Sequence, residues 1–272
     1  MFDNKHLLKL AHMLHNRCND ALILRGSLSL NVRVAEKAAF DECRLTEDAD
    51  FYLRESLSFH KFYKIVNEVV ADAFGKTMFT EIRRTPTKRS SGSVDVFDGI
   101  NRLFSFDVDL RVPGVTIQYN SELFSGELIE LEALVADKVD AISTERVLVR
   151  LKDVYDLYLV SKYFEIEYDK VKNYYDGIPK NERKQQMRIE GALFSAFKEK
   201  YDELHELYLQ QDEIIYKPEF EKVYLGARAI LKPFLTVSDE IRDSHAIWSP
   251  KGQTWVIDFG FGNPLRQTKT EE

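Results

Sequence analysis

The feature that most constrains the fold is a long run of alternating apolar and polar residues between positions 79 and 119. It consists of four stretches, FTEIRRTPT, SGSVDVFD, RLFSFDVDLRV and VTIQY, which are separated by Pro, Gly, Asp and Asn residues. A period of two is typical of strands with one buried face, and these separators favour turns. The pattern therefore predicts antiparallel strands that follow one another in a meander.

Helical periodicity surrounds this block on both sides. Apolar residues recur every three or four positions in residues 4–16, 60–75, 127–143, 144–164, 188–208 and 218–231. Thr144 is a candidate N-cap. A buried strand is expected over residues 21–25, and two short extended pieces around a turn are expected within residues 245–260. We therefore expect a mixed α/β domain at residues 1–125, followed by a mostly helical domain at residues 126–272.

The charge balance limits how the chain meets polyanions. It has 38 Lys and Arg residues against 45 Asp and Glu residues, a net charge of −7, so contact with nucleic acid needs a local basic patch. Its two cysteines, Cys18 and Cys43, form neither a disulfide framework nor a zinc-ligand spacing, which favours a reducing, cytoplasmic setting. No apolar run approaches the roughly 20 residues that span a bilayer, so no membrane contact is expected.

Two carboxylates are expected side by side in the segment TEDADFYL. Asp48 and Asp50 are two residues apart on a predicted strand, so their side chains project from the same face. Like charges this close raise each other's pKa, and a divalent ion between them relieves the repulsion. Mg²⁺ prefers one or two carboxylates together with water and substrate phosphates. The pair therefore predicts a magnesium site, with the solvated face of an edge strand as the alternative.

A third acid lies in the stretch FSFDVDLRV. Its two phenylalanines and Val108 form a buried face, which places Asp107 and Asp109 together on the opposite face. If this strand lies beside the strand of Asp48 and Asp50, three carboxylates can hold two ions about 3.5 to 4 Å apart, which suits in-line displacement at phosphorus. Either Asp107 or Asp109 fits as the third acid.

Three further elements have chemistry suited to phosphate. Gly26 and Ser27 follow a buried strand, where exposed N–H groups can cradle a phosphate, although an ordinary turn has the same residues. Lys138 interrupts the apolar stripe of a predicted helix, either as a snorkelling lysine or as one that faces phosphate. Asp153 and Asp156 share a face of the next helix. A solvated acidic edge is the alternative for that pair.

The order of these elements resembles a known family. The segments LRGSLSL, RLTEDADF, FDVDL, ADKVDAI and RLKDVYDLY are similar to the motifs of the AbiEii/AbiGii-type nucleotidyltransferase toxins, members of the DNA-polymerase-β-like nucleotidyltransferase superfamily. The resemblance covers roughly residues 20–160. It implies an α+β fold in which a polymerase-β-like mixed sheet with flanking helices precedes a mostly helical half.

The resemblance also implies a role for each matching residue. The implied catalytic residues are Asp48, Asp50, Asp107, Lys138 and Asp153. The implied nucleotide-binding residues are Gly26, Ser27, Arg44, Thr46 and Lys138, and the metal ligands are Asp48, Asp50 and Asp107, or Asp109 in its place. Asp156 would be a structural partner. The implied reaction is Mg²⁺-dependent transfer of NMP from an NTP to RNA, in particular the 3′ end of tRNA, with a cognate antitoxin as protein partner.

Two basic segments are candidates for contact with RNA. EIRRTPTKR contributes Arg83, Arg84, Lys88 and Arg89, and KNERKQQMR contributes four more cations. The first is the better candidate because it lies beside the sheet that bears the carboxylates, whereas the second is typical of a solvated surface. Two other functions fit the residues: nucleotidyl transfer to a small molecule or a protein side chain, and a catalytically silent NTP-binding module.

Overall fold

The computed structural model of the chain describes residues 4–87, 90–110, 115–143, 147–235 and 245–257. These residues form two compact units. Within these ranges, the first unit comprises the residues up to Leu134 together with Gln210–Pro218, and the second comprises those from Val135 to Leu209 and from Glu219 onward. The boundary falls inside helix α4 (Leu131–Ile142). The candidate N-cap Thr144 lies outside the described residues.

The first unit is built on a seven-stranded mixed sheet with the order β3-β4-β5-β2-β1-β7-β6. Its strands are β1 (Leu22–Arg25), β2 (Asp48–Leu53), β3 (Met78–Arg84), β4 (Gly92–Asp98), β5 (Asn101–Asp109), β6 (Thr116–Asn120) and β7 (Ser125–Ile129). Two pairs are parallel, β2 with β5 and β1 with β7, and the other neighbours are antiparallel. The mixed sheet confirms the predicted α+β class.

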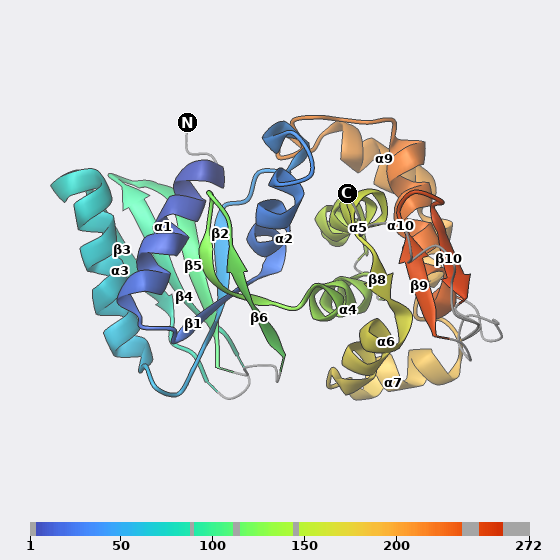
Figure 1. Ribbon diagram of the computed structural model, residues 1–272, viewed down its shortest axis with the longest axis horizontal. Coiled ribbons are helices and arrows are strands. Elements are labelled where there is room, and N and C mark those ends of the chain that lie inside the picture. The colour runs from blue at the N-terminus through green and yellow to red at the C-terminus, as the bar shows by residue number, and fades with distance from the viewer. Residues whose placement is uncertain (1–3, 88–89, 111–114, 144–146, 236–244, 258–272) are drawn as a thin grey trace, which may run out of the picture. The chain divides into compact units, whose positions relative to one another are not determined.

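Helices α1 (Asn4–Arg17) and α3 (Phe59–Phe74) pack on the apolar face of this sheet (Figure 1). Their buried side chains join those of the strands, such as Phe51 and Phe106, in one hydrophobic core. Ser58 caps α3 by accepting a hydrogen bond from the Lys61 N–H, and Gly75 ends it. Both helices confirm their predictions. Because they cover the apolar face, the polar residues of β2 and β5 occupy the opposite one.

The predicted meander is correct for three strands and wrong for the fourth. β3, β4 and β5 are consecutive antiparallel neighbours, but VTIQY forms β6 at the other edge of the sheet, where it pairs with β7. The predicted helix at 127–143 is also wrong at its start, because residues 127–129 belong to β7 and α4 begins at Leu131. Main-chain hydrogen bonds from β7 to both β1 and β6 override the local helical periodicity there.

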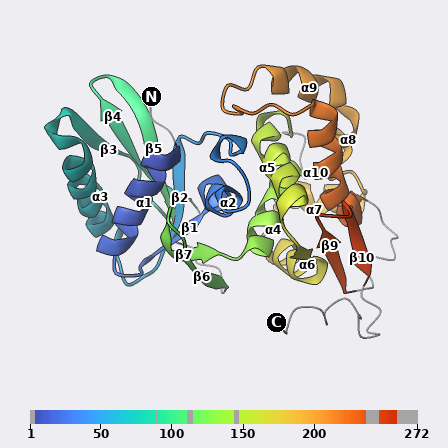
Figure 2. The same cartoon turned by 45° about the horizontal axis from the view of Figure 1, so that its top comes forward.

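The second unit is mostly helical. It contains the end of α4, a 3-10 turn η3 (Val147–Arg150), α5 (Leu151–Tyr163), α6 (Tyr168–Gly177), α7 (Glu182–Ile189), α8 (Ser195–Glu199), α9 (Tyr201–Leu209) and α10 (Phe220–Leu235). A small sheet of β8 (Ile166–Glu167), β9 (Ala246–Ser249) and β10 (Thr254–Ile257) completes it. α5 and α10 pack side by side (Figure 2). No helix in the described part of the chain is long and apolar enough to cross a membrane.

The sequence-based expectations for this unit are partly correct. The two extended pieces near the C-terminus are confirmed as the antiparallel pair β9 and β10. The continuous helix expected at 188–208 is wrong, because a turn at Gly191 and a break at Lys200 divide it into the end of α7, α8 and α9. Gly191 has a φ of +72°, a conformation that interrupts a helix and favours glycine.

Both cysteines are thiols, and both are buried in the first unit. Burial raises the pKa of the Cys18 thiol from 9.0 to about 12, although the charge of Lys61 lowers it slightly. The thiolate is the reactive form, so we expect neither cysteine to react with iodoacetamide at pH 8 in the folded protein and both to react after denaturation. Mass spectrometry measures the labelling. Rapid modification of Cys18 in the folded protein would contradict this burial.

Candidate active site

Three carboxylates, those of Asp48, Asp50 and Asp107, project from the polar face of the sheet. β2 and β5 are parallel neighbours, and their register pairs Asp50 with Asp107 and Asp48 with Ser105. Residues paired across adjacent strands project from the same face. The Ser105 hydroxyl donates a hydrogen bond of 2.6 Å to Asp48 Oδ1. The structure therefore pairs Asp50 with Asp107 and places Asp48 on the same face, next along β2, as expected if the two strands are neighbours.

Asp109 occupies a different position on the same face. It is paired with Tyr52, two residues further along the strands than the pair of Asp50 and Asp107. Its side chain is buried and lies 3.6 Å from Arg25 Nη1, and the Arg25 guanidinium also stacks over the Tyr52 ring at 4.4 Å. This geometry favours Asp107 over Asp109 as the neighbour of Asp50.

Gly26 lies where β1 passes into helix α2 (Gly26–Ala35), as the strand, Gly-Ser, helix order predicted. Its φ is +64°, and a Cβ added there would lie 2.3 Å from Asp50 Oδ2. A glycine is therefore required both by the backbone and by the close approach of the carboxylate. This close approach places the N-terminus of α2, with the N–H groups of its first turn, directly beside the acidic face.

Replacing Gly26 with Ala is expected to destabilise the protein by about 1 to 3 kcal/mol and to reduce catalysis about a hundredfold, because Asp50 must move. Gly99→Ala is a matched control: its φ is +58°, but nothing lies within 4 Å of the added Cβ. Urea denaturation and a turnover assay measure both variants. Equal effects of the two changes on catalysis would contradict the role of the Gly26–Asp50 contact.

Two arginines form ion pairs with carboxylates of the acidic face, Arg102 with Asp48 and Arg83 with Asp107. Arg102 Nη2 lies 2.9 Å from Asp48 Oδ1, and its Nε lies 3.2 Å from Asp95 Oδ1. Arg83 Nη2 lies 3.5 Å from Asp107 Oδ1. Burial lowers the pKa of Arg102, but hydrogen bonds and charge from Asp95 and Asp48 outweigh it and raise the pKa above its ordinary value. Arg102 therefore stays charged and fixes the orientation of Asp48.

The alternation of apolar and polar residues along β5 does not predict that Arg102 contacts the acidic face. Counting by twos from Phe104 and Phe106 places residue 102 on the apolar face. The pairing of β4 with β5 shifts between Val96 and Phe97, so Arg102 pairs with Phe97 and its guanidinium reaches the acidic face. Such a shift changes which residues share a face. The Arg-Leu-Phe spacing alone contains no signal of it.

The candidate nucleotide-binding residues of the first unit cluster around the start of α2. Arg44 Nη2 donates a short hydrogen bond to Ser27 Oγ, and Arg44 is 6% exposed. The Thr46 hydroxyl donates to the Asp48 carbonyl oxygen at 3.1 Å. Asn4 holds this segment by donating to the Arg44 carbonyl at 2.7 Å and accepting from the Thr46 N–H at 3.0 Å. Sequence reasoning missed Asn4, because its position at the start of the helix predicted over residues 4–16 does not reveal this contact.

The oxygen atoms on this face suit Mg²⁺ better than a softer metal. Within the described ranges, no three His, Cys, Asp or Glu side chains converge closely enough to hold an ion by themselves. Mg²⁺ does not need such a cage, because one or two carboxylates usually bind it while water and substrate phosphates complete its shell. The paired Asp50 and Asp107, with Asp48 next along β2, fit an ion bound in this way.

Lys138 and the two helix acids form a buried ion cluster in the second unit. Lys138 Nζ lies 2.6 Å from Asp153 Oδ1 and 2.7 Å from Asp156 Oδ2. Asp156 is 0% exposed, and the other two side chains are also buried. The alternative of a solvated acidic edge is therefore wrong, because α5 turns both acids toward α4. Because Lys138 is buried, it is not a snorkelling lysine, and the alternative of a lysine that faces phosphate stays a prediction.

The basic segments have different surroundings. Arg83 and Arg84 lie on the edge strand β3, where Arg84 donates to Ser91 Oγ at 2.6 Å. Lys88 and Arg89 lie outside the described residues. In the second segment, Lys180 and Lys184 both pair with Asp140, at 3.0 and 2.6 Å. Part of that segment therefore stabilises the second unit through ion pairs that sequence reasoning did not predict.

Comparison with known proteins identifies the class of this protein. Residues 9–224 match the family described as nucleotidyl transferase AbiEii toxin, type IV toxin–antitoxin system. The match covers well over half of the chain, and the protein is therefore a nucleotidyltransferase. It belongs to the AbiEii family of type IV toxin–antitoxin systems, as the motif resemblance predicted. Membership of this family implies an NTP substrate and an antitoxin partner.

Other comparisons add less. A search of curated proteins finds no match. Among solved structures, the chain is similar to MenT4, a nucleotidyltransferase toxin from Mycobacterium tuberculosis H37Rv. The two share 15% sequence identity over 88% of this chain and 86% of that chain, with a TM-score of 0.45. The assignment to the AbiEii family therefore rests on the sequence match.

Proposed function

We propose that this protein transfers NMP from an NTP to an RNA acceptor, the 3′ end of tRNA, in a Mg²⁺-dependent reaction. The observation that carries the proposal is the pairing of Asp50 with Asp107 on the face that also bears Asp48. Gly26, at the start of α2, lies so close to Asp50 that there is no room for a Cβ. This arrangement supports a triphosphate at the N-terminus of α2 beside an acidic face. In-line transfer at phosphorus requires positioning and charge compensation at such a place.

The residues of the first unit have distinct proposed roles. Asp48, Asp50 and Asp107 would hold Mg²⁺, which when bound offsets the negative charge that develops on the phosphoryl oxygens. N–H groups at Gly26 and Ser27 would bind phosphate oxygens, because the first N–H groups of a helix have no partner within it. Arg44 beside Ser27 adds a fixed positive charge there. Thr46 would maintain the backbone that leads into Asp48.

Lys138 and Asp153 enter the proposal through the family motifs and their chemistry. Lys138 would neutralise phosphate charge, and Asp153 would orient the attacking hydroxyl. Lys138 Nζ lies 2.6 Å from Asp153 Oδ1, so the two side chains with these proposed roles are in direct contact. Asp156, which lacks solvent exposure, would position Lys138.

The proposed RNA contact uses the edge strand β3. Arg83 and Arg84 are exposed there, and Arg83 also contacts Asp107, so an RNA backbone on this strand would lie next to the acidic face. Lys88 and Arg89 extend the same basic segment in the sequence. A net charge of −7 makes a localised contact of this kind more suitable than binding over the whole surface.

The test is an acceptor panel. The purified protein is incubated with each labelled NTP and Mg²⁺, together with tRNA, total RNA, an aminoglycoside or a protein mixture. We expect label on the 3′ end of tRNA. We expect no label when the 3′ end of the tRNA is oxidised with periodate beforehand, and none with the Asp50→Ala variant. Label on the drug or on polypeptide would replace the RNA acceptor with one of those classes. Tight NTP binding without label in any acceptor would instead identify a catalytically silent module.

A further inference from the structure

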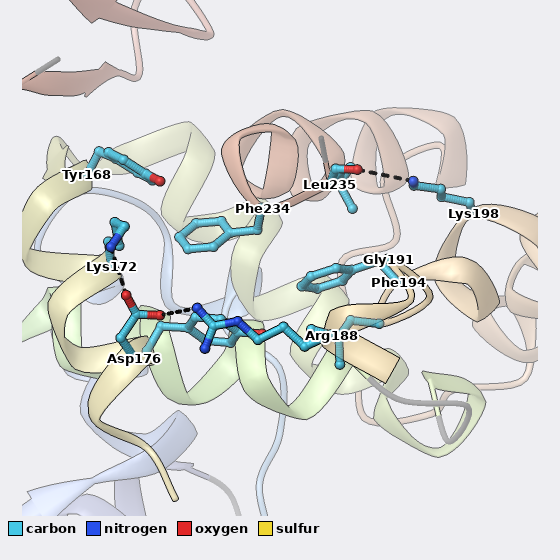
Figure 3. A pocket seen from close by; sticks show the side chains of 11 residues that line it. Tyr168, Lys172, Asp176, Arg188, Gly191, Phe194, Lys198, Phe234 and Leu235 are labelled. Atoms are coloured by element: carbon cyan, nitrogen blue, oxygen red, sulfur yellow. Dashed lines mark hydrogen bonds and ion pairs between the residues drawn. The ribbon is translucent and has the colours of Figure 1, made fainter. Parts of the chain in front are cut away.

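The second unit contains a pocket that the proposed transfer reaction does not use. It has a volume of about 250 Å³ and lies among α6, the end of α7, the start of α8 and the end of α10 (Figure 3). Its lining combines four aromatic rings with four charged side chains, next to Leu193 and Leu235. This combination differs from an ordinary packing defect, which is lined by aliphatic groups.

The charged residues of the pocket are mostly cations. Lys172 Nζ lies 2.7 Å from Asp176 Oδ2, and Arg188 Nη2 lies 3.0 Å from Asp176 Oδ1. Lys198 donates a hydrogen bond of 3.2 Å to the carbonyl oxygen of Leu235. Three cations against one carboxylate leave a net charge of +2 in a chain whose net charge is −7. An anion is therefore the favoured ligand.

Asp176 organises two of these cations. Burial raises the pKa of Asp176, but hydrogen bonds and charge from Lys172 and Arg188 outweigh it and lower the pKa below its ordinary value. The carboxylate therefore stays ionised and holds both cations at the pocket. Lys172 and Arg188 have further donor atoms beyond those that contact Asp176. These donors suit the oxygens of a phosphate, to which Arg binds in a planar, bidentate manner.

Aromatic rings stand beside these cations. Phe234 packs against Tyr168 with ring centroids 5.6 Å apart and against Tyr175 at 5.4 Å. Figure 3 shows Phe234 and Phe194 pointing into the same space from different segments, with Arg188 alongside. Aromatic faces next to Arg or Lys are the usual platform for an unpaired base, because the ring stacks on the base while the cation meets its phosphate.

We propose that this pocket binds the base and phosphate of an unpaired nucleotide, either a free nucleoside monophosphate or one nucleotide of single-stranded RNA. The pocket is large enough for one base. A duplex is not expected to bind, because both faces of each of its bases are already stacked on neighbouring bases. The proposal does not depend on the transfer reaction, because binding here needs neither NTP nor Mg²⁺.

Calorimetric titration of the full chain tests the proposal, with EDTA present to suppress Mg²⁺-dependent nucleotide binding elsewhere. The probes are CMP and AMP, then cytidine, inorganic phosphate, a single-stranded RNA tetramer and the same sequence in a duplex. We expect the monophosphates to bind at least about tenfold more tightly than cytidine or phosphate alone, because base and phosphate contacts add. Equal binding of CMP, cytidine and phosphate would overturn the proposal. A tetramer that binds more tightly than CMP identifies RNA as the source, and equal affinities identify the free nucleotide.

Variants assign the binding to this pocket. Arg188→Gln and Lys198→Gln alter exposed side chains, so the fold should persist, and each is expected to weaken CMP binding about tenfold. Phe234→Leu keeps an apolar group but removes the aromatic face. Lys222→Gln on α10, an exposed lysine that pairs with Glu219, is the matched control and should bind as the wild type does. CMP binding that is unchanged in all three pocket variants would overturn the proposal.

Discussion

Asp50→Asn is expected to reduce nucleotidyl transfer by about 10³-fold or more while leaving the protein folded. The change removes the negative charge of a group that faces both Asp107 and Gly26, but it keeps the size of the side chain. The loss should appear in turnover rather than in global stability, because relieving repulsion among neighbouring carboxylates does not weaken the fold. Label transfer to tRNA and urea denaturation measure the two properties.

A matched pair on β5 sharpens this expectation. Asp107→Asn should lower transfer by about 10² to 10³-fold, whereas Asp109→Asn should lower it by less than about tenfold. Asp109→Asn should instead reduce stability, because it removes the carboxylate 3.6 Å from Arg25 inside the protein. Asp107 and Asp109 have the same side chain and lie on the same face of one strand. A difference between the two variants therefore reports on which of the two positions lies opposite Asp50. Loss of transfer in the folded Asp109→Asn variant alone would reverse the assignment of the third acid.

Lys138→Met is expected to destabilise the second unit by about 3 to 5 kcal/mol. The lysine is the cation that lies within 2.7 Å of both Asp153 and Asp156, and removing it leaves two buried carboxylates without that charge. Each would then have to be desolvated at a cost that its remaining contacts offset only in part. Urea denaturation, followed by the near-ultraviolet signal of the buried Trp248 in the same unit, measures the loss.

Two further variants interpret that loss. Lys222→Met removes an exposed lysine whose pairing with Glu219 contributes at most about 1 kcal/mol, so it should be nearly neutral. Combining Lys138→Met with Asp156→Leu should recover much of the stability, because an apolar side chain replaces the most buried acid. A Lys138→Met variant as stable as Lys222→Met would show that the ion cluster is not a stabilising element. Transfer measured in the stable double variant then reports on Lys138 in catalysis separately from folding.

Local patterns predicted many elements because they depend on neighbouring residues. The three and four spacing of α1 and α3 records which side of each helix is buried, and both helices formed as predicted. Gly26 was identifiable because it follows a buried strand, where glycine permits close approach of the backbone, and the structure adds a φ of +64°. The prediction of a continuous helix at 188–208 was wrong because the three and four spacing in that stretch does not reveal the turn at Gly191 or the break at Lys200.

The acidic site was predictable in its composition but not in its assembly. Alternation placed Asp48 with Asp50, and Asp107 with Asp109, each pair on one face of its own strand. Which strand lies beside which, and with what register, depends on main-chain hydrogen bonds between segments more than 50 residues apart. Arg102 shows the same limit, because a register shift against β4 reversed the face that simple alternation assigned.

The sequence by itself determined the class of fold, the polar face of each strand, the residue types suited to Mg²⁺ and phosphate, and the family. Only the tertiary structure decided that Asp107 rather than Asp109 faces Asp50, that β6 and β7 close the far side of the sheet, and that Lys138 is enclosed by two acids. The physical reason is the range of the interactions. Periodicity records whether a side chain meets the core or the solvent, whereas pairing between distant strands and helices is decided by hydrogen bonds and packing that form when the chain folds.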